Sequence, residues 1–457
     1  MIQKGVGALE QISRWIGWLG AIVWGPTMLL FMMAVGVLLT LRTGFFQFRR
    51  MPSVLRNTVG SLWGRRGKGA SGGISPFQAV STALAATLGT GNIAGVATAL
   101  VAGGPGAIFW MWASALFTMM TKYAEVALAV LYRERDSQGL YRGGPMYYIQ
   151  KGLKMPWLGA VFGVCCVLAS FGIGNLTQVH TMAHGLWESF QVPTWVTGVV
   201  TAAAVCLVIV GGIRRVGSFT QVLVPLMALL YMGAGTLVLV RNAHGVPGAF
   251  SLILRSAFSP QAAVGGVAGY SVMRAIRFGL ARGVFTNEAG LGSAPMAHAS
   301  ADTKGPVEQG MWGIFEVFAD TVVMCGFSGV VILSSGDLWQ SGLDGAALTS
   351  AVFVQALGPA GGWVVSVSMV FFAFSSILGW AWYGECALGW LTGGSRFWVG
   401  VYRLLYVGAT ALGAGAALDL VWNLSDLLNG LMALPNLLAI LCLSGEVVRI
   451  TRGWKPK

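Results

Sequence analysis

The sequence predicts an all-α protein with many membrane-spanning helices, and its composition and segment lengths both support this. The 457 residues are 55% hydrophobic and 10% charged, with a mean hydropathy of +0.71, whereas soluble domains carry about 25% charged residues. A helix needs about 20 mostly apolar residues to cross a bilayer, and about eleven segments reach that length. Backbone groups in lipid must pair within their own segment, so helices are expected, and no barrel-like alternation is visible.

The placement of charge distinguishes a membrane protein from a nucleic-acid binder, although the formal net charge is +13. Lysine and arginine residues gather in alternate loops between the apolar segments, which is the positive-inside pattern. The loops after the first and third spans are the most basic: Arg42, Arg49, Arg50, Arg56, Arg65, Arg66 and Lys68, then Arg133, Arg135, Arg142, Lys151 and Lys154. We expect these loops in the cytoplasm, the N-terminus outside, the C-terminus inside and no nucleic-acid partner.

The spans are expected to form a single transmembrane domain over residues 1–457. The first, residues 18–41, is too long for a signal-peptide core and is followed by no small-residue cleavage site, so it should remain as an extra leading helix. The ten spans that follow divide into two sets of five, over residues 75–240 and 261–447. No stretch between them is long enough for a soluble domain.

The segment that begins at Pro76 is rich in glycine and threonine at its centre. Gly89, Thr90 and Gly91 favour unwinding there, and Asn92 adds an oxygen donor of the kind that binds sodium. Transporters built from inverted repeats bind substrate and ions at such interruptions, where carbonyls meet cations and free N–H groups meet a carboxylate. The alternative is a helix-packing surface of small residues, which is common in membranes.

A second interruption is expected five spans later, in the segment that opens the second set of five. Gly265, Gly266 and Gly269 provide the expected break, and Arg274 and Arg277 follow closely, which makes the span short. A broken segment at the start of each half is the arrangement of inverted-repeat transporters. The match is one of topology, because the halves show no convincing sequence repeat.

Hydroxyl and amide side chains in two other spans are candidates for binding. Ser375 and Ser376 interrupt a late aromatic span and are able to face the first broken segment; the alternative is a bond to their own i−4 carbonyls. In the fourth span, Phe171, Asn175 and Gln178 fall near one face and present an aromatic ring and two amides. These amides either contact substrate or join helices together.

Ionisable side chains inside spans are energetically costly and therefore mark functional or structural pairs. Lys122 and Glu125 are three residues apart on one predicted helix and are expected to pair near its cytoplasmic end. Glu316 and Asp320, four apart on another helix, cannot pair with each other, so each needs a donor elsewhere or a proton. Structural or gating ion pairs, proton coupling and cation binding all remain open for these carboxylates.

The remaining chemistry-bearing residues do not form the pattern of an enzyme or a metal centre. Glu288 is expected at a cytoplasmic helix end, with Arg282 as its candidate partner. The six cysteines and four histidines lack metal-ligand spacing, and no nucleotide-binding or nucleophile motif stands in a strand–turn–helix setting. We therefore expect no enzyme activity and no cofactor, and transport driven by an ion gradient.

Six blocks, in order along the chain, carry a resemblance to a known family: GTGNIAGVATAL, GGPGAIFWMW, KYAEVALAVLYR, GGPMYYIQKGL, GVFTNEAGLGSAPMAHA and FAFSSILGWAWYGE. Together they resemble the sodium:alanine/glycine symporter family, over nearly the whole chain from Phe45 to Cys442. The resemblance implies a LeuT-type fold of five plus five helices after one extra helix. It also implies a multi-pass protein of the cell inner membrane that takes up alanine or glycine with sodium as the coupling ion.

The resemblance further assigns roles to individual residues. One sodium site would be formed by the carbonyls of Ala85 and Leu88 and the hydroxyls of Ser375 and Ser376. Asn92, with Thr87, is the candidate for a second sodium site. The substrate site that the resemblance implies contains Thr87, Gly89, Thr90, Gly91, Phe171, Gln178 and Trp380.

Two alternatives to sodium symport remain open at the level of sequence. A proton-coupled amino-acid transporter of the same fold group would place the coupling on Glu316, Asp320 or Glu125. A membrane-embedded enzyme or passive channel is the other, although the chain shows no assembled nucleophile, metal cluster or pore motif. The expected partners are a small amino acid, sodium and the lipid bilayer; the oligomeric state is left open.

Overall fold

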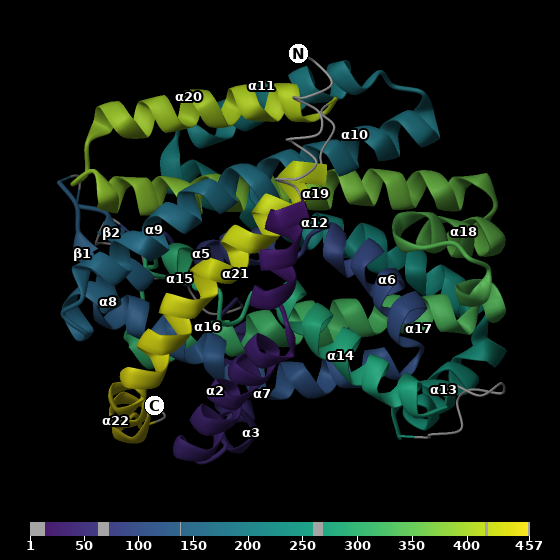
Figure 1. Ribbon diagram of the computed structural model, residues 1–457, viewed down its shortest axis with the longest axis horizontal. Coiled ribbons are helices and arrows are strands. Elements are labelled where there is room, and N and C mark those ends of the chain that lie inside the picture. The colour runs from purple at the N-terminus through teal and green to yellow at the C-terminus, as the bar shows by residue number, and fades with distance from the viewer. Residues whose placement is uncertain (1–13, 63–72, 138, 259–267, 416–418, 456–457) are drawn as a thin grey trace.

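The computed structural model describes residues 14–62, 73–137, 139–258, 268–415 and 419–455, and these ranges are mostly helical (Figure 1). Seven helices among them are long and apolar enough to cross a membrane: Arg14–Arg42, Gly106–Leu131, Pro156–Phe190, Gly212–Arg241, Pro306–Ser334, Pro359–Leu391 and Asn423–Cys442. Three shorter apolar helices, Ala94–Gly103, Thr194–Ile209 and Gly345–Leu357, accompany them. The prediction of a helical protein with many membrane spans is confirmed at this level.

The elements follow one another without a domain boundary. The first part of the chain contains α2 (Pro26–Arg42), α3 (Phe46–Arg49), α4 (Met51–Asn57), η1 (Val59–Leu62), α5 (Pro76–Thr87), η2 (Thr90–Asn92), α6 (Ala94–Gly103), α7 (Gly106–Leu131), β1 (Glu134–Arg135), β2 (Tyr141–Arg142), α8 (Pro145–Gly152), α9 (Pro156–Phe171), η3 (Gly172–Leu176), α10 (Thr177–Phe190), α11 (Thr194–Ile209) and α12 (Gly212–Arg241). The second part contains η4 (Ala243–Gly245), α13 (Val246–Phe258), α14 (Ala268–Asn287), α15 (Pro295–His298), α16 (Pro306–Val317), η5 (Phe318–Cys325), α17 (Gly326–Ser334), η6 (Asp337–Gln340), α18 (Gly345–Leu357), α19 (Pro359–Leu391), α20 (Arg396–Gly413), α21 (Asp419–Cys442) and α22 (Ser444–Gly453).

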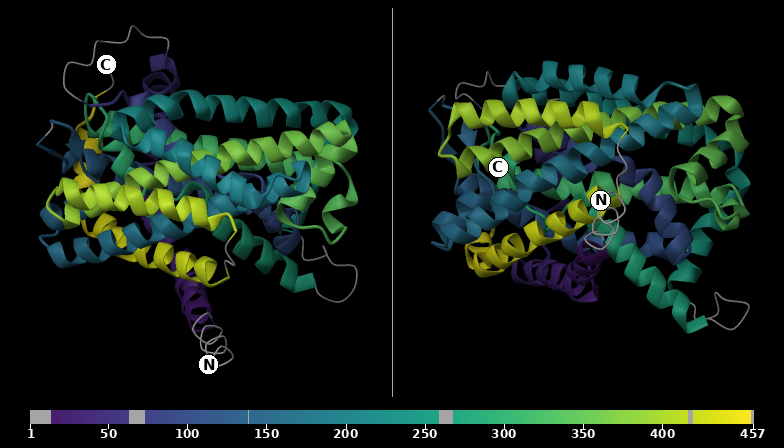
Figure 2. Two further views of the ribbon diagram at one scale, coloured as in Figure 1. Left: turned by 90° about the horizontal axis from the view of Figure 1, so that it is seen from above. Right: turned by 45° about the horizontal axis from the view of Figure 1, so that its top comes forward.

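Helix α7 occupies the centre of the packing. It contacts α2, α14 and α16, and most of its side chains are buried. The long helices α9, α19 and α20 run close to parallel, whereas the leading helix (residues 14–42) crosses them and projects from one face (Figures 1 and 2). The leading helix is interrupted by a turn at Trp24 and Gly25, immediately before Pro26.

The first interruption lies where the glycines predicted it. Helix α5 starts with a capping box, in which Ser75 and Gln78 satisfy each other's backbone N–H groups, and Pro76 occupies its first turn. It ends at Thr87, Gly89 is extended, and a single 3₁₀ turn separates it from α6. The segment is therefore two short helices joined by an irregular loop in the middle of the protein.

The second interruption lies elsewhere than predicted. Gly269 belongs to α14, which continues to Asn287, while Gly265 and Gly266 lie outside the described residues. The irregular backbone comes after α14, at residues 288–294, where Glu288, Gly290 and Gly292 all have positive φ. The expected position of this break was wrong, because the helix tolerates Gly269 and breaks only where consecutive residues adopt left-handed conformations.

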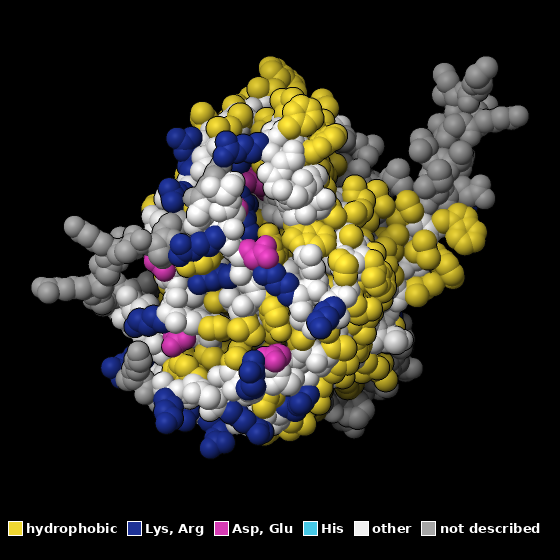
Figure 3. Space-filling model, turned by 90° about the vertical axis from the view of Figure 1, so that its left-hand side faces the viewer, with side chains coloured by type: hydrophobic (Ala, Val, Ile, Leu, Met, Phe, Trp, Pro, Cys, Tyr) yellow, Lys and Arg dark blue, Asp and Glu magenta, His cyan; other side chains and the backbone are white. Residues whose placement is uncertain are grey.

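Lysine and arginine side chains gather on the end of the molecule shown in Figure 3. A cavity of about 820 Å³ at that end is lined by Arg142, Arg396 and Arg403 together with Glu385. Arg403 pairs with Glu385 at 2.8 Å, and Arg142 lies 3.7 Å from the same carboxylate. This ion-pair cluster joins β2, α19 and α20.

The second interruption should depend on Gly292. A Cβ at this residue would lie 2.6 Å from Cγ of Pro145, and the φ of +82° strains any L side chain. Gly292→Ala should destabilise the protein by about 2–4 kcal/mol, from left-handed strain plus overpacking. The measurement is thermal unfolding of the purified protein. Gly393→Ala is the matched control, since φ is +62° with no atom within 4 Å of the added carbon; equal losses would contradict the packing argument.

Candidate functional site

A cavity of about 560 Å³ lies where the first interruption, α10, α14, α19, α21 and the leading helix meet. Seven of the predicted site residues line it: Thr87, Gly89, Thr90, Gly91, Gln178, Ser376 and Trp380. Gly174, in the π-helical stretch η3, allows the close approach of α19, because a Cβ there would lie 2.3 Å from Cβ of Trp380. The cavity thus brings together residues that are almost 300 positions apart in the sequence.

The first interruption presents unpaired backbone donors beside this cavity. The side-chain oxygen of Asn92 accepts the N–H of Gly89 at 3.0 Å and so closes the irregular loop. Among the described residues, the N–H groups of Thr90 and Gly91 have no hydrogen-bond partner. Free N–H groups at a helix start form a ready anion site, so this loop is able to receive a carboxylate.

The hydroxyls of α19 reach the last turn of α5. Ser375 donates to the carbonyls of Ala85 at 3.0 Å and Phe372 at 2.8 Å. Ser376 lies 3.3 Å from the carbonyl of Ala86 and 3.1 Å from that of Phe372. Both readings of these serines therefore hold at once, since each hydroxyl contacts its own helix and the broken helix. Four to five oxygens converge here with no basic group among them.

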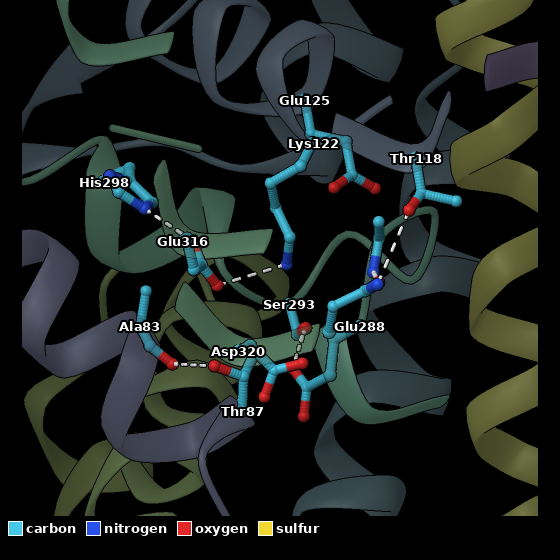
Figure 4. Close-up of polar contacts among 12 residues, drawn as sticks. Ala83, Thr87, Thr118, Lys122, Glu125, Glu288, Ser293, His298, Glu316 and Asp320 are labelled. Carbon is cyan, nitrogen blue, oxygen red and sulfur yellow. Dashed lines mark hydrogen bonds and ion pairs between the residues drawn. The ribbon is translucent and has the colours of Figure 1, made fainter. Parts of the chain in front are cut away.

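Two residues assigned to sodium make other contacts. The amide nitrogen of Asn92 donates to the carboxylate of Asp320 at 2.7 Å, so this side chain links the first interruption to η5. The Thr87 hydroxyl donates to the carbonyl of Ala83 at 3.3 Å, within its own helix (Figure 4). The side-chain oxygen of Asn92 remains near the break, and the role of this residue in ion binding stays a prediction.

Two predicted residues lie away from the cavity lining. Phe171 packs with its ring centroid 5.4 Å from Tyr402 and 5.6 Å from Tyr406, so the structure places it behind the cavity wall. Leu88 ends α5, and its N–H still bonds the carbonyl of Leu84 at 2.7 Å. Its side chain is buried in apolar contacts.

Glu288 is a cavity-lining residue whose position sequence reasoning missed. It stands at the start of the second interruption with φ of +53° and is almost fully buried. Its carboxylate accepts hydrogen bonds from the hydroxyl of Ser293 and, at 3.2 Å, from the indole N–H of Trp380. The prediction that Arg282 would be its partner was wrong; Glu288 instead connects the second interruption to α19.

The second interruption is held by a carboxylate from α7. One oxygen of Glu125 accepts the N–H groups of Gly290 at 3.0 Å and Gly292 at 3.1 Å, together with the side-chain amide of Asn436 at 2.5 Å. The predicted pairing of Glu125 with Lys122 was wrong. Glu125 replaces the carbonyl partners that these glycines would have in a continuous helix.

Lys122 points from α7 into a group of buried carboxylates (Figure 4). Its ammonium lies 3.3 Å from one oxygen of Glu316, and both side chains are fully buried. The other oxygen of Glu316 lies 3.0 Å from Nε2 of His298, whose Nδ1 accepts a bond from Gln309 at 2.9 Å. Glu316 and Asp320 therefore find partners on other helices, as the spacing required.

The missed residues share a recognisable signal. The run Asn287-Glu288-Ala289-Gly290-Leu291-Gly292 contains two closely spaced glycines and two polar residues between apolar segments, which is the composition that identified the first interruption. The cavity also receives Arg282, Phe285 and Thr286 from α14 and Asp426 from α21. Among the described residues, no group of three or more histidine, cysteine, aspartate or glutamate side chains is arranged to hold a metal ion.

A polar cavity between interrupted helices, inside a protein with many spans, defines a secondary transporter. The family model described as the sodium:alanine symporter family matches residues 9–457, and the chain belongs to this family. Family membership makes it a transporter and not an enzyme.

Relatives match along almost the whole chain. It is 45% identical over 439 residues to the sodium/alanine symporter AgcS of Methanococcus maripaludis, covering 94% of this chain and 95% of that one. It is 46% identical over 434 residues to an uncharacterized transporter of Haemophilus influenzae, covering 94% of each. The probable sodium/glutamine symporter GlnT of Bacillus subtilis is 37% identical over 444 residues, with 96% and 90% covered. A solved manganese transporter of Eremococcus coleocola gives a TM-score of 0.48 at 13% identity, over 82% of this chain and 78% of that one; nothing is concluded from it.

The ion pair of Lys122 and Glu316 should be strongly coupled. Lys122→Met should destabilise the protein by about 3–5 kcal/mol, because it leaves a buried carboxylate without its counter-charge. Adding Glu316→Gln should recover a large part of that loss. The measurement is thermal or denaturant unfolding of both single variants and the double variant, and additive losses would show that the two charges act independently.

Proposed function

We propose that this protein is a sodium-coupled symporter that takes up a small neutral amino acid, alanine or glycine, by alternating access. The observation that carries the proposal is the contact of Ser375 and Ser376 with the carbonyls of Ala85 and Ala86, beside the cavity. Membership of the sodium:alanine symporter family supports cation-coupled transport of an amino acid. The names of the relatives extend the substrates of the group from alanine to glutamine.

The proposed sodium site uses neutral oxygens only. Sodium prefers hard oxygen ligands, and helix ends and unwound segments supply them in membrane transporters. The hydroxyls of Ser375 and Ser376 and the carbonyls of Ala85 and Phe372 already lie within hydrogen-bond distance of one another. Leu88 brings a further carbonyl at the end of α5. An ion among them would connect α5 to α19.

The proposed substrate site lies next to the sodium site. The free N–H groups of Thr90 and Gly91 would bind the substrate carboxylate. Trp380 and Gln178 line the same cavity and would limit the space for a side chain, which favours a small amino acid. Phe171 would act on this pocket only through the wall that it supports.

A continuous set of contacts would couple the two sites. Trp380 follows Ser376 by one helical turn on α19 and donates to Glu288 of the second interruption. Sodium bound at Ser376 would therefore fix α19 against α5 and, through Trp380, against the second interruption. Sodium and substrate affinities should then increase each other reciprocally.

The architecture that we propose is a LeuT-type repeat of five plus five helices, over residues 75–240 and 261–447, preceded by the leading helix. Helices α5/α6 and α14/α15 would be the corresponding broken helices. The end that carries Arg142, Arg396 and Arg403 (Figure 3) would face the cytoplasm by the positive-inside rule. This places the N-terminus outside and the C-terminus inside, in the cell inner membrane.

Uptake of labelled alanine and glycine into proteoliposomes tests the proposed function. An inward sodium gradient should drive accumulation, and replacing sodium by potassium at fixed pH should abolish it. A proton gradient without sodium should have no effect. Accumulation driven by protons alone would instead assign the coupling to the carboxylates, and failure with every gradient would reject alanine and glycine as substrates.

Removing the two hydroxyls should weaken the response to sodium more than the fold. In Ser375→Ala/Ser376→Ala, the sodium concentration for half-maximal uptake should rise at least about tenfold, because two ligands are lost. Ser368→Ala is the matched control, since Ser368 is buried on the same helix and its hydroxyl has no partner among the described residues. An unchanged sodium response in the double variant would place the ion elsewhere.

A further inference from the structure

The cavity extends well beyond the proposed substrate site. Its volume of about 560 Å³ is in the range of pockets that enclose drug-sized ligands and is several times larger than alanine or glycine. One part is formed by the two interruptions and α19. The other part is formed by α14, α21 and the leading helix, which contribute Arg282, Asp426, Asn429, Gly20 and Trp24.

We propose that this second part is a separate binding position for a zwitterionic amino acid, between Arg282 of α14 and Asp426 of α21, with the leading helix as its wall. It is called the second subsite below and comprises Arg282, Asp426 and Asn429. The inference rests on the proposed function, since it concerns the route of the same substrate. The second subsite holds the amino acid before it reaches the interruptions.

The first argument is the placement of opposite charges. Arg282 and Asp426 both line the cavity and interact electrostatically, yet no ion pair within 4.0 Å joins them. Within the part of the chain that the structure describes, neither side chain makes a hydrogen bond; Arg282 packs near the ring of Phe285 at 5.7 Å. A partly buried charge without a direct partner is costly. A zwitterion supplies both missing partners, its carboxylate to the guanidinium and its ammonium to the carboxylate.

The second argument is an unsatisfied polar group aimed at the same space. Asn429 is 1% exposed and lines the cavity. Its side-chain oxygen has no hydrogen-bond partner among the described residues. Asn429 and Asp426 are three residues apart, on one face of α21, and both are acceptors suited to an ammonium group. Buried acceptors are normally satisfied, so a donor is expected here.

The leading helix closes this space. Gly17, Gly20, Ala21 and Trp24 line the cavity at helical spacing. The indole N–H of Trp24 donates to the backbone carbonyl of Asp426 at 2.7 Å, and its ring lies 6.0 Å from Phe285. Gly20 is buried, but a Cβ there would meet nothing within 4 Å, because it would point into the cavity. The leading helix thereby contributes to the substrate route although it lies outside the proposed repeats.

Neutralising either charge should slow substrate capture and leave binding at the interruptions nearly intact. In proteoliposomes, Arg282→Gln and Asp426→Asn should each lower kcat/KM for labelled L-alanine at least about tenfold, with a loss of its salt dependence. Equilibrium binding of L-alanine in saturating sodium should change less than about threefold. Arg282→Lys should recover part of the uptake. Arg449→Gln, an exposed surface charge, is the control for loss of charge and should behave as the wild type.

Filling the wall tests the same position without removing a charge. Gly20→Leu should lower kcat/KM at least about tenfold by occupying the second subsite. Gly233→Leu is the matched control, because Gly233 is an exposed helical glycine with no atom within 4 Å of an added Cβ. Its uptake should be unchanged.

Each outcome decides the inference. Wild-type kcat/KM in both charge variants and in Gly20→Leu would overturn it, as would losses that accompany an equal fall in melting temperature or in equilibrium affinity. Absence of sodium-driven uptake by the wild-type protein would reject the proposed function instead, so the two failures are distinguishable.

Discussion

The structure depends on how it satisfies backbone groups where a helix is interrupted inside the membrane domain. Buried N–H and C=O groups without partners are costly in lipid, because no water replaces them. Here side chains replace them: Asn92 accepts the N–H of Gly89, and Glu125 accepts those of Gly290 and Gly292. The N–H groups that are left over at Thr90 and Gly91 lie beside the cavity, where a substrate carboxylate is able to use them. The interruptions are therefore stable loops, with a binding surface defined by the groups that no side chain covers.

The same side chains concentrate negative charge in the core. Glu125, Glu288, Glu316 and Asp320 are all buried, and the described core supplies one lysine, Lys122, which pairs with Glu316. Amide and hydroxyl donors compensate the others: Asn436 for Glu125, Ser293 and Trp380 for Glu288, and Asn92 and Thr321 for Asp320. Hydrogen bonds to a carboxylate are stronger than neutral ones, so these contacts fix the geometry of both interruptions. The carboxylates thus bind the helices of the core to one another, which is a sufficient reason for their presence without proton coupling.

The sequence predicted the elements of the site better than their partners. Clustered glycines identified the first interruption correctly, because Gly89 and Gly91 stand in an otherwise apolar segment. The same criterion failed at Gly269, since a glycine near the start of a helix and a glycine in a left-handed loop are identical in composition. Lys122 and Glu125 illustrate the other limit. Their spacing permits a pair on one helix, but packing brings Glu316 to Lys122 and the amides of the second interruption to Glu125, and such long-range choices have no local signal.

The contacts across α19 explain why one helix can serve both ion and substrate. Ser375 and Ser376 face α5, and Trp380, one turn later, faces Glu288. A rigid helix that touches both interruptions transmits a shift at one to the other, whereas two separate side chains on flexible loops would not. Trp24 and Asp426 extend the same principle to the leading helix, which is joined to α21 by a backbone contact and lies against the cavity. An additional helix at the edge of a five-plus-five arrangement is then part of the substrate route, because the cavity has no wall on that side without it.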